Sequence, residues 1–151
     1  MFTDPNTLTP EEELAYLKEI YGEENPERLI EILTDAFNVL QNRAQMLLSL
    51  ITITLTITGF SGPGIARSSI VAMAAIAFGL LFVLISALIL MAGPLRLNWC
   101  TRTREGTMDA SLIKLIVQRN QRTDRYHAAS VTLVIGLVGY VSSVIIFLVT
   151  G

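Results

Sequence analysis

Charged residues are absent from three long stretches of this sequence. Segment 44–69 contains one charged side chain, Arg67, and segments 70–95 and 128–151 contain none. The whole chain is 52% hydrophobic and 16% charged, whereas soluble domains usually carry about 25% charged residues. A soluble bundle needs a polar face on each helix, and these stretches have none. The sequence therefore favours a membrane protein over a soluble helical bundle.

Each apolar stretch is long enough to cross a bilayer. A helix of about 20 apolar residues spans a hydrocarbon core of roughly 30 Å, and an isolated strand could not satisfy its backbone groups there. We predict an all-α integral membrane protein with three transmembrane helices, over about 44–60, 70–92 and 128–149. A small cytoplasmic helical extension completes the predicted fold.

The sequence also lacks the patterns of catalytic and metal sites. A single cysteine, Cys100, excludes an internal disulfide and a cysteine-based metal cluster. The single histidine, His127, has no acid placed to orient it, and no phosphate-binding glycine loop is present. The predicted spans contain no Asp, Glu, Lys or Arg, groups on which proton-coupled transporters and voltage sensors depend. We therefore predict no enzyme activity, no cofactor and no metal.

Acidic and basic residues are separated along the chain. Residues 1–43 carry ten acidic and three basic side chains, a net charge of −7, whereas residues 95–127 carry seven basic and three acidic ones, a net charge of +4. Basic segments beside membrane spans remain in the cytoplasm. We therefore predict an inner-membrane protein with a cytoplasmic N-terminus and a C-terminus on the outer face. We expect the basic segment to contact lipid head groups or a partner, and not nucleic acid, through Arg96, Trp99, Arg102, Arg104, Arg119, Arg122 and Arg125.

We divide the chain into an acidic segment, 1–25, with a short amphipathic helix, and a transmembrane domain, 26–151, whose cytoplasmic loop and helix occupy 95–127. The short helix has a capping box, in which Thr9 and Glu12 bond to each other's backbone. It should end at Tyr21, before Gly22. Its apolar face contains Leu14, Leu17 and Tyr21, and so short a helix needs a surface on which to pack.

A second helix should begin at Pro26 and run to about Thr58, which is much longer than a span requires. We expect a tight turn at 61–64, and a last helix that Asp109 caps and that continues unbroken into the third span. The extramembrane parts of these two helices have apolar faces that should dock, formed by Leu29, Leu33, Phe37 and Leu40 on one side and Leu112, Leu115 and Ile116 on the other.

Small residues form a ridge along the third span. They recur at steps of three and four residues, as Ala129, Thr132, Gly136, Gly139 and Ser143, and the second span contributes Ala75 and Gly79. Such seams allow helix backbones to approach closely in lipid. The ridge could pack within this chain or between chains, and the sequence leaves both possibilities open.

Hydroxyl side chains form a stripe in the first span. Ser49, Thr52 and Thr56 fall on one side of the expected helix. They could bond to their own helix backbone, reach a neighbouring helix, or line a pore.

Two stretches resemble the transmembrane effector domain of the Pycsar anti-phage systems, the PycTM family. One is Asn42-Arg43-Ala44-Gln45-Met46-Leu47-Leu48 at the entrance to the first span, and the other is Gln118-Arg119-Asn120-Gln121-Arg122-Thr123-Asp124-Arg125-Tyr126 before the last span. The resemblance covers about residues 28–149. It implies a helical membrane module that assembles and impairs the bilayer when a signal arrives. No cyclic-nucleotide-binding domain is visible, so a sensor would be another chain or the cytoplasmic bundle.

These observations lead to two main hypotheses of function. The first is a non-enzymatic, oligomerising inner-membrane protein that acts as a membrane-perturbing or pore-forming effector. The second is a structural accessory subunit of a larger membrane complex, because small-residue seams and uncharged spans fit that role equally well. A regulator that binds lipid surfaces through the basic segment is a third class.

Overall fold

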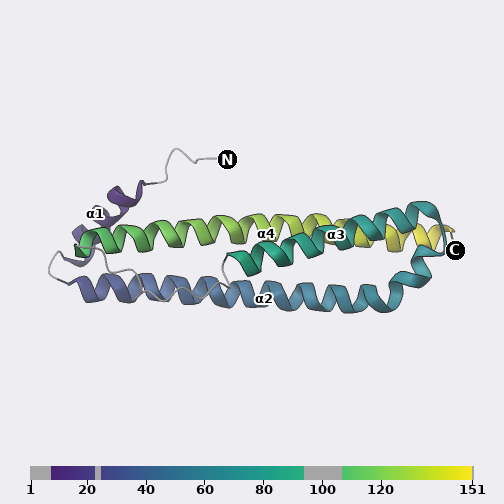
Figure 1. Ribbon diagram of the computed structural model, residues 1–151, viewed down its shortest axis with the longest axis horizontal. Coiled ribbons are helices and arrows are strands. Elements are labelled where there is room, and N and C mark those ends of the chain that lie inside the picture. Colours follow the sequence, from purple (N-terminus) through teal and green to yellow (C-terminus); the bar gives the residue numbers. More distant parts are fainter. Residues whose placement is uncertain (1–7, 23–24, 94–106, 151) are drawn as a thin grey trace. The chain divides into compact units, whose positions relative to one another are not determined.

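The computed structural model describes residues 8–22, 25–93 and 107–150. These residues form four helices and no strand: α1 (Pro10–Tyr21), α2 (Pro26–Ala66), α3 (Ile70–Ala92) and α4 (Met108–Thr150) (Figure 1). Helices α2, α3 and α4 are each long and apolar enough to cross a membrane. The predicted all-α fold with three spans is therefore confirmed, and the chain is a multi-pass membrane protein.

The helices divide between two compact units. The first unit contains α1 and the N-terminal parts of α2, up to Leu40, and of α4, up to Arg122. The second contains α3 and the remaining parts of α2 and α4. Both α2 and α4 therefore contribute to both units. The sequence predicted this, because no helix breaker separates the extramembrane part of either helix from its span.

Helix α1 begins and ends where its sequence signals predict. The Thr9 hydroxyl accepts a hydrogen bond from the Glu12 backbone N–H at 3.3 Å, and the Glu12 carboxylate accepts one from the Thr9 backbone N–H at 2.8 Å. Hydrogen bonding of the carboxylate by the Thr9 backbone N–H, and to a smaller extent by the Thr9 side chain, lowers the pKa of Glu12. At the other end Gly22 has a φ of 88°, a conformation that glycine adopts without steric cost.

The first unit has a core of aliphatic side chains. Leu29 and Leu33 of α2 pack with Leu112 and Ile116 of α4, and Leu14 of α1 closes the cluster. The predicted docking of the two apolar faces is thus confirmed, and the surface that α1 needs is this pair of helices. Tyr21, which we expected on the same face, is instead 40% exposed.

Two ion pairs join α1 to α4 at the edge of this core. Lys18 lies 2.7 Å from Asp109, and Glu13 lies 2.7 Å from Arg119. The Glu13–Arg119 pair is the better shielded, since both side chains are about one quarter exposed or less. Partly exposed pairs contribute only about 0–1 kcal/mol each, so the apolar contacts dominate the stability of this unit.

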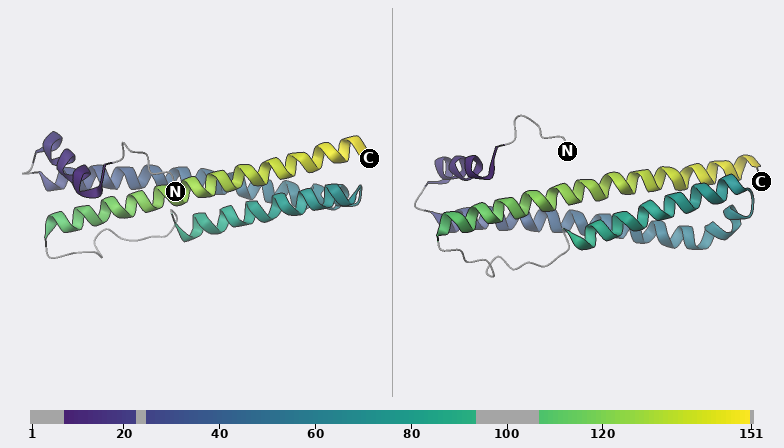
Figure 2. Two further views of the ribbon diagram at one scale, coloured as in Figure 1. Left: turned by 90° about the horizontal axis from the view of Figure 1, so that it is seen from above. Right: turned by 45° about the horizontal axis from the view of Figure 1, so that its top comes forward.

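The second unit is a bundle of three helices in which α3 runs antiparallel to α2 and α4 (Figure 2). Its main cluster includes Ile51 of α2, Val83 and Leu90 of α3, and Ala129 and Leu133 of α4. Many of the large apolar side chains outside this cluster are exposed, among them Phe60, Ile70 and Leu88. Outward-facing side chains of this kind suit a lipid environment, in which exposed apolar surface has no cost.

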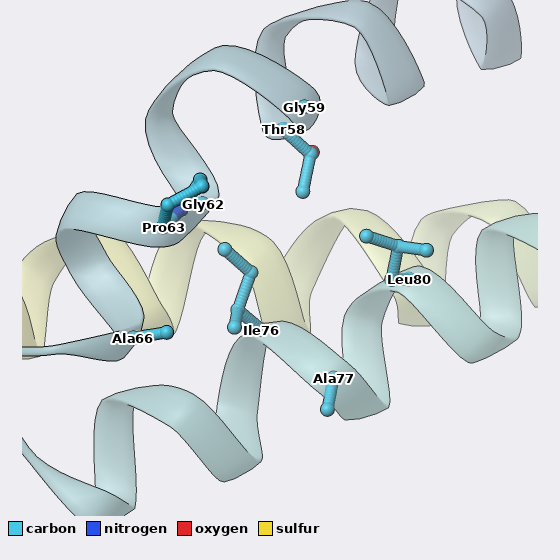
Figure 3. Close-up of a pocket in the computed structure, with 8 residues that line it drawn as sticks. All are labelled: Thr58, Gly59, Gly62, Pro63, Ala66, Ile76, Ala77 and Leu80. Carbon is cyan, nitrogen blue, oxygen red and sulfur yellow. The ribbon is translucent and has the colours of Figure 1, made fainter.

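The predicted turn at 61–64 is wrong, because α2 continues through these residues to Ala66. Proline lacks a backbone N–H, so Pro63 cannot donate to the Gly59 carbonyl. In a membrane, a helix that lacks one such bond is more favourable than a loop at the same place, because a loop would expose many unpaired backbone groups to lipid. The helix changes direction near this end instead of stopping (Figures 1 and 3). The chain reverses only after Ala66, and Ser69 caps α3 by accepting from the Ala72 N–H at 3.1 Å.

The predicted cap at Asp109 is also wrong. Helix α4 begins at Met108, and the Thr107 hydroxyl accepts a hydrogen bond from the Ala110 N–H at 3.3 Å. Asp109 lies in the first turn, where a carboxylate favours the positive end of the helix dipole, and its side chain pairs with Lys18. The prediction that this helix continues unbroken into the last span is confirmed.

Candidate helix-packing and membrane-facing sites

Three glycines bring α3 and α4 into close contact. A Cβ atom added to Gly79 would lie 2.8 Å from the Gly136 carbonyl oxygen and 2.8 Å from the Tyr140 backbone nitrogen. A Cβ on Gly139 would lie 3.0 Å from the Gly79 Cα. No side chain larger than hydrogen fits at Gly79 unless the backbones move apart. The predicted small residues of the second and third spans thus meet here within one chain.

The other ridge residues surround this contact. Ala129 and Ser143 are fully buried, whereas Thr132 and Ala75 are half-buried. The hydroxyl groups bond to their own helix: Thr132 donates to the Ala128 carbonyl at 2.7 Å, and Ser143 donates to the Tyr140 carbonyl at 2.7 Å. These serine and threonine side chains therefore present little more than small apolar volume to the neighbouring helix.

One hydrogen bond between α3 and α4 was not predicted. The Ser86 hydroxyl is fully buried and donates to the Ala129 carbonyl oxygen at 2.7 Å. Ser86 follows Gly79 by seven residues, so the two lie on the same side of α3. That spacing was visible in the sequence, and it could have identified Ser86 as a contact between helices.

The hydroxyl stripe of α2 faces away from the bundle. Ser49, Thr52 and Thr56 are exposed, and each donates to the carbonyl four residues earlier, at 3.1, 3.0 and 2.9 Å respectively. Of the alternatives that the sequence left open, the structure displays bonding to the helix's own backbone. Each oxygen keeps acceptor capacity for water or for a second helix.

Two further threonines of α2 face the opposite way. Thr54 and Thr58 are buried at 7% and 4% exposure, and they donate to the Leu50 and Thr54 carbonyls at 2.8 and 2.7 Å. The alternating threonines thus separate by the helical period into an inward pair and an outward pair. All four satisfy their hydroxyl protons in the same way, so only their surroundings differ.

The three basic-segment arginines that the structure describes all contact their own chain. Arg119 pairs with Glu13, and the Arg122 guanidinium lies 5.0 Å from the centre of the Phe37 ring. Within the second unit, Arg125 donates to the Ala92 carbonyl at 2.7 Å and so caps the end of α3. Arg96, Trp99, Arg102 and Arg104, the other residues predicted to contact lipid or a partner, lie outside the described residues.

Within the described ranges, no three His, Cys, Asp or Glu side chains converge in a way that could hold a metal ion. Comparison with family models, with curated proteins and with solved structures found no match to this chain.

Proposed function

We propose that this chain is a non-enzymatic, oligomerising inner-membrane protein whose assembly perturbs the bilayer, as a pore-forming effector of the anti-phage type does. The observation that carries the proposal is the outward stripe of Ser49, Thr52 and Thr56 on α2. A helix that meets only lipid gains nothing from such a stripe. Hydroxyl side chains that face a second helix or a water-filled path gain hydrogen bonds.

The glycine contact supports this choice of surface. Gly79, Gly136 and Gly139 are already occupied by one another within the chain, so they are not available for packing between copies. Assembly must then use another face, and the α2 stripe supplies small polar side chains at steps of three and four residues. The resemblance of 42–48 and 118–126 to the PycTM family agrees with an assembling membrane module.

The inward threonines provide a matched control for testing the stripe. We compare Thr52→Val with Thr56→Val, as a double variant, against the double variant Thr54→Val with Thr58→Val. Both doubles remove two hydroxyls that donate to the helix backbone, and both keep the side-chain shape. Membrane potential is followed with a voltage-sensitive dye in a bacterial host that expresses each variant at equal, verified membrane levels.

We expect the wild-type chain to depolarise the membrane and the outward double to lose most of that effect, while the inward double keeps it. Equal loss in both doubles would assign the effect to the helix itself and not to the stripe. An unchanged potential with the wild-type chain would contradict the effector proposal.

The second candidate function is a structural accessory subunit of a larger membrane complex. The same uncovered hydroxyl face of α2 favours it, because such a face fits a helix of another protein as well as a second copy. The mass of the detergent-solubilised protein, purified alone and from its native membrane, separates the two. A homo-oligomer supports the effector, and co-purification with a larger assembly supports the subunit.

The orientation of the chain in the membrane is also part of the proposed function. The net charge of +4 over 95–127 favours a cytoplasmic position for that segment, with the N-terminus on the same side and the C-terminus outside. Cys100 should therefore resist a membrane-impermeant thiol reagent in cells whose outer membrane alone is permeabilised. Labelling of Cys100 under those conditions would show that the orientation in the membrane is the reverse of the proposed one.

A further inference from the structure

An apolar groove lies where the bent end of α2 meets α3. It has a volume of about 330 Å³ and is open on one side, and its lining consists of Thr58, Gly59, Gly62, Pro63 and Ala66 of α2 with Ile76, Ala77 and Leu80 of α3 (Figure 3). This volume is at the lower end of the range for ligand pockets, roughly 300–1,000 Å³. All of the lining belongs to the second unit.

The groove exists because α2 lacks side-chain volume at this point. Gly59 and Gly62 contribute no side chain, and the bend associated with Pro63 turns the last part of the helix. A Cβ added to Gly59 would have no atom within 4 Å, and one on Gly62 would first meet the end of Ile76 at 3.4 Å. There is thus room here that the chain's own side chains leave unfilled.

The lining accepts only an apolar occupant. Thr58 is its one side chain with a polar group, and that hydroxyl donates to the Thr54 carbonyl. A Cβ on Gly62 would lie 3.8 Å from the Thr58 methyl carbon, which places that methyl toward the groove. Hydrocarbon chains match a surface of this kind, since they bring no hydrogen-bonding group that the lining would leave unpaired.

A cation is adjacent in sequence to one of the lining residues. Arg67 directly follows the lining residue Ala66, and its side chain is exposed. It is the only ionisable residue between Ala44 and Leu95, so no acidic side chain of that stretch of α2 and α3 can neutralise it. Guanidinium groups bind phosphate through two parallel hydrogen bonds. An apolar groove next to an arginine that has no ion pair among the described residues matches a phospholipid, which has an apolar tail on one side and a phosphate on the other.

We propose that this groove is a binding site for a glycerophospholipid, with one acyl chain between α2 and α3 and the phosphate at Arg67. An apolar side chain of a second copy, such as the 86% exposed Phe60, could fill the groove, but it would leave Arg67 without an anion. The lipid site does not depend on pore formation, and it would exist equally in an accessory subunit.

The test uses a phosphatidylglycerol whose acyl chain carries a photoactivatable diazirine. The full chain is reconstituted in vesicles that contain a small fraction of this lipid, illuminated, digested and analysed by mass spectrometry. We expect labelling to concentrate in residues 58–66 and 76–80. Gly59→Leu should fill the groove and remove most of that labelling. Gly64→Leu is the matched control, since a Cβ there also meets open space but the residue does not line the groove.

Arg67→Gln tests the phosphate half of the site without touching the groove. One arginine near a membrane surface contributes enough to shift occupancy by an anionic lipid about fivefold. Labelling by phosphatidylglycerol should fall by about that factor, whereas labelling by a diazirine diacylglycerol, which has no phosphate, should not change.

Two results would overturn the proposal. Labelling that is spread along the exposed faces of α2 and α3 and is indifferent to Gly59→Leu would mean bulk lipid only. Disulfide formation between copies that carry Phe60→Cys and Ala77→Cys, with labelling of the groove absent, would show that a second copy occupies it. Equal helicity and elution volume of Gly59→Leu and Gly64→Leu establish that both variants fold.

Discussion

The helices of the two units pack in different ways. The first unit is filled by large aliphatic residues such as Leu29 and Leu33, whereas the second combines an aliphatic cluster with a close backbone contact at Gly79, Gly136 and Gly139. Water drives large apolar side chains together in proportion to the area that they bury. Lipid provides no such force, so helices associate through close backbone approach and polar contacts. The difference indicates which environment each unit is built for.

Truncating the core of the first unit should give the largest effect. Leu33 is 1% exposed, and Leu33→Ala should lower the stability of this unit by about 2–5 kcal/mol through lost burial and a cavity. Hydrogen–deuterium exchange should then accelerate in 10–21, 26–40 and 108–122 but not in α3. Val39→Ala, at a 51% exposed position of the same helix, should leave exchange unchanged. Acceleration of exchange throughout the chain would mean that the two units do not unfold separately.

Enlarging the glycine contact should destabilise the second unit. In Gly79→Leu the new side chain would collide with backbone atoms of Gly136 and Tyr140, and overpacking of this kind costs about 1–3 kcal/mol. The midpoint of thermal unfolding in detergent should therefore drop. Gly64→Leu adds the same side chain to open space and should leave the midpoint close to that of the wild type. Equal midpoints would show that α3 and α4 can separate without loss of stability.

Removing the buried hydroxyl of α3 should have a smaller effect. Ser86→Ala deletes the hydrogen bond to the Ala129 carbonyl, and bonds between membrane helices contribute about 0.6–1.7 kcal/mol. The control is Ser142→Ala, which removes a hydroxyl that bonds only to its own helix at Val138. If both variants unfold at the same temperature, the Ser86 bond adds nothing to the association of α3 with α4.

Acid should weaken the cap at the start of α1, and this is the smallest expected effect. The hydrogen bonds from Thr9 lower the pKa of Glu12 in the folded chain. The capping interaction is therefore complete above the unfolded-state pKa of this carboxyl and is lost as pH falls through the folded-state value. Amide exchange at the beginning of 10–21 should increase over that acidic range. Glu12→Gln should remove the pH dependence and Glu11→Gln should preserve it; a response that survives Glu12→Gln would implicate another group.

The boundaries of α1 were predictable from its capping residues. Thr9, Glu12 and Gly22 act on their immediate neighbours, so their effect can be read from a short segment. The same reasoning failed at Pro63. A helix in water would stop there, because a loop can bond its backbone groups to water, but a loop in lipid cannot, so the membrane helix continues. We predicted Asp109 as the cap of α4, but Thr107 caps it, and Asp109 pairs with Lys18, which is 91 residues away in sequence.

The candidate surfaces were predictable in part. Periodicity placed Ser49, Thr52 and Thr56 together and grouped the small residues of the last span, because spacing by three and four residues defines one side of any helix. Periodicity did not show which side of each helix would be covered by a neighbouring helix. Thr54 and Thr58 differ from Thr52 and Thr56 only in the neighbours that the fold gives them. The engagement of Arg119 by Glu13 and of Arg125 by the end of α3 likewise joins distant segments.

The sequence by itself determined that the chain is helical and crosses a membrane, because the length and charge of each apolar run set the solvent in which it is stable. It also determined the cap of α1 and the apolar faces that dock in the first unit. The tertiary structure alone decided that the glycine ridge is used within the chain, that Ser86 bonds to α4, and that the end of α2 leaves a groove beside Arg67. Each of these depends on which helices become neighbours, and residues of different helices, such as Ser86 and Ala129 at 43 positions apart, meet only after the chain has folded.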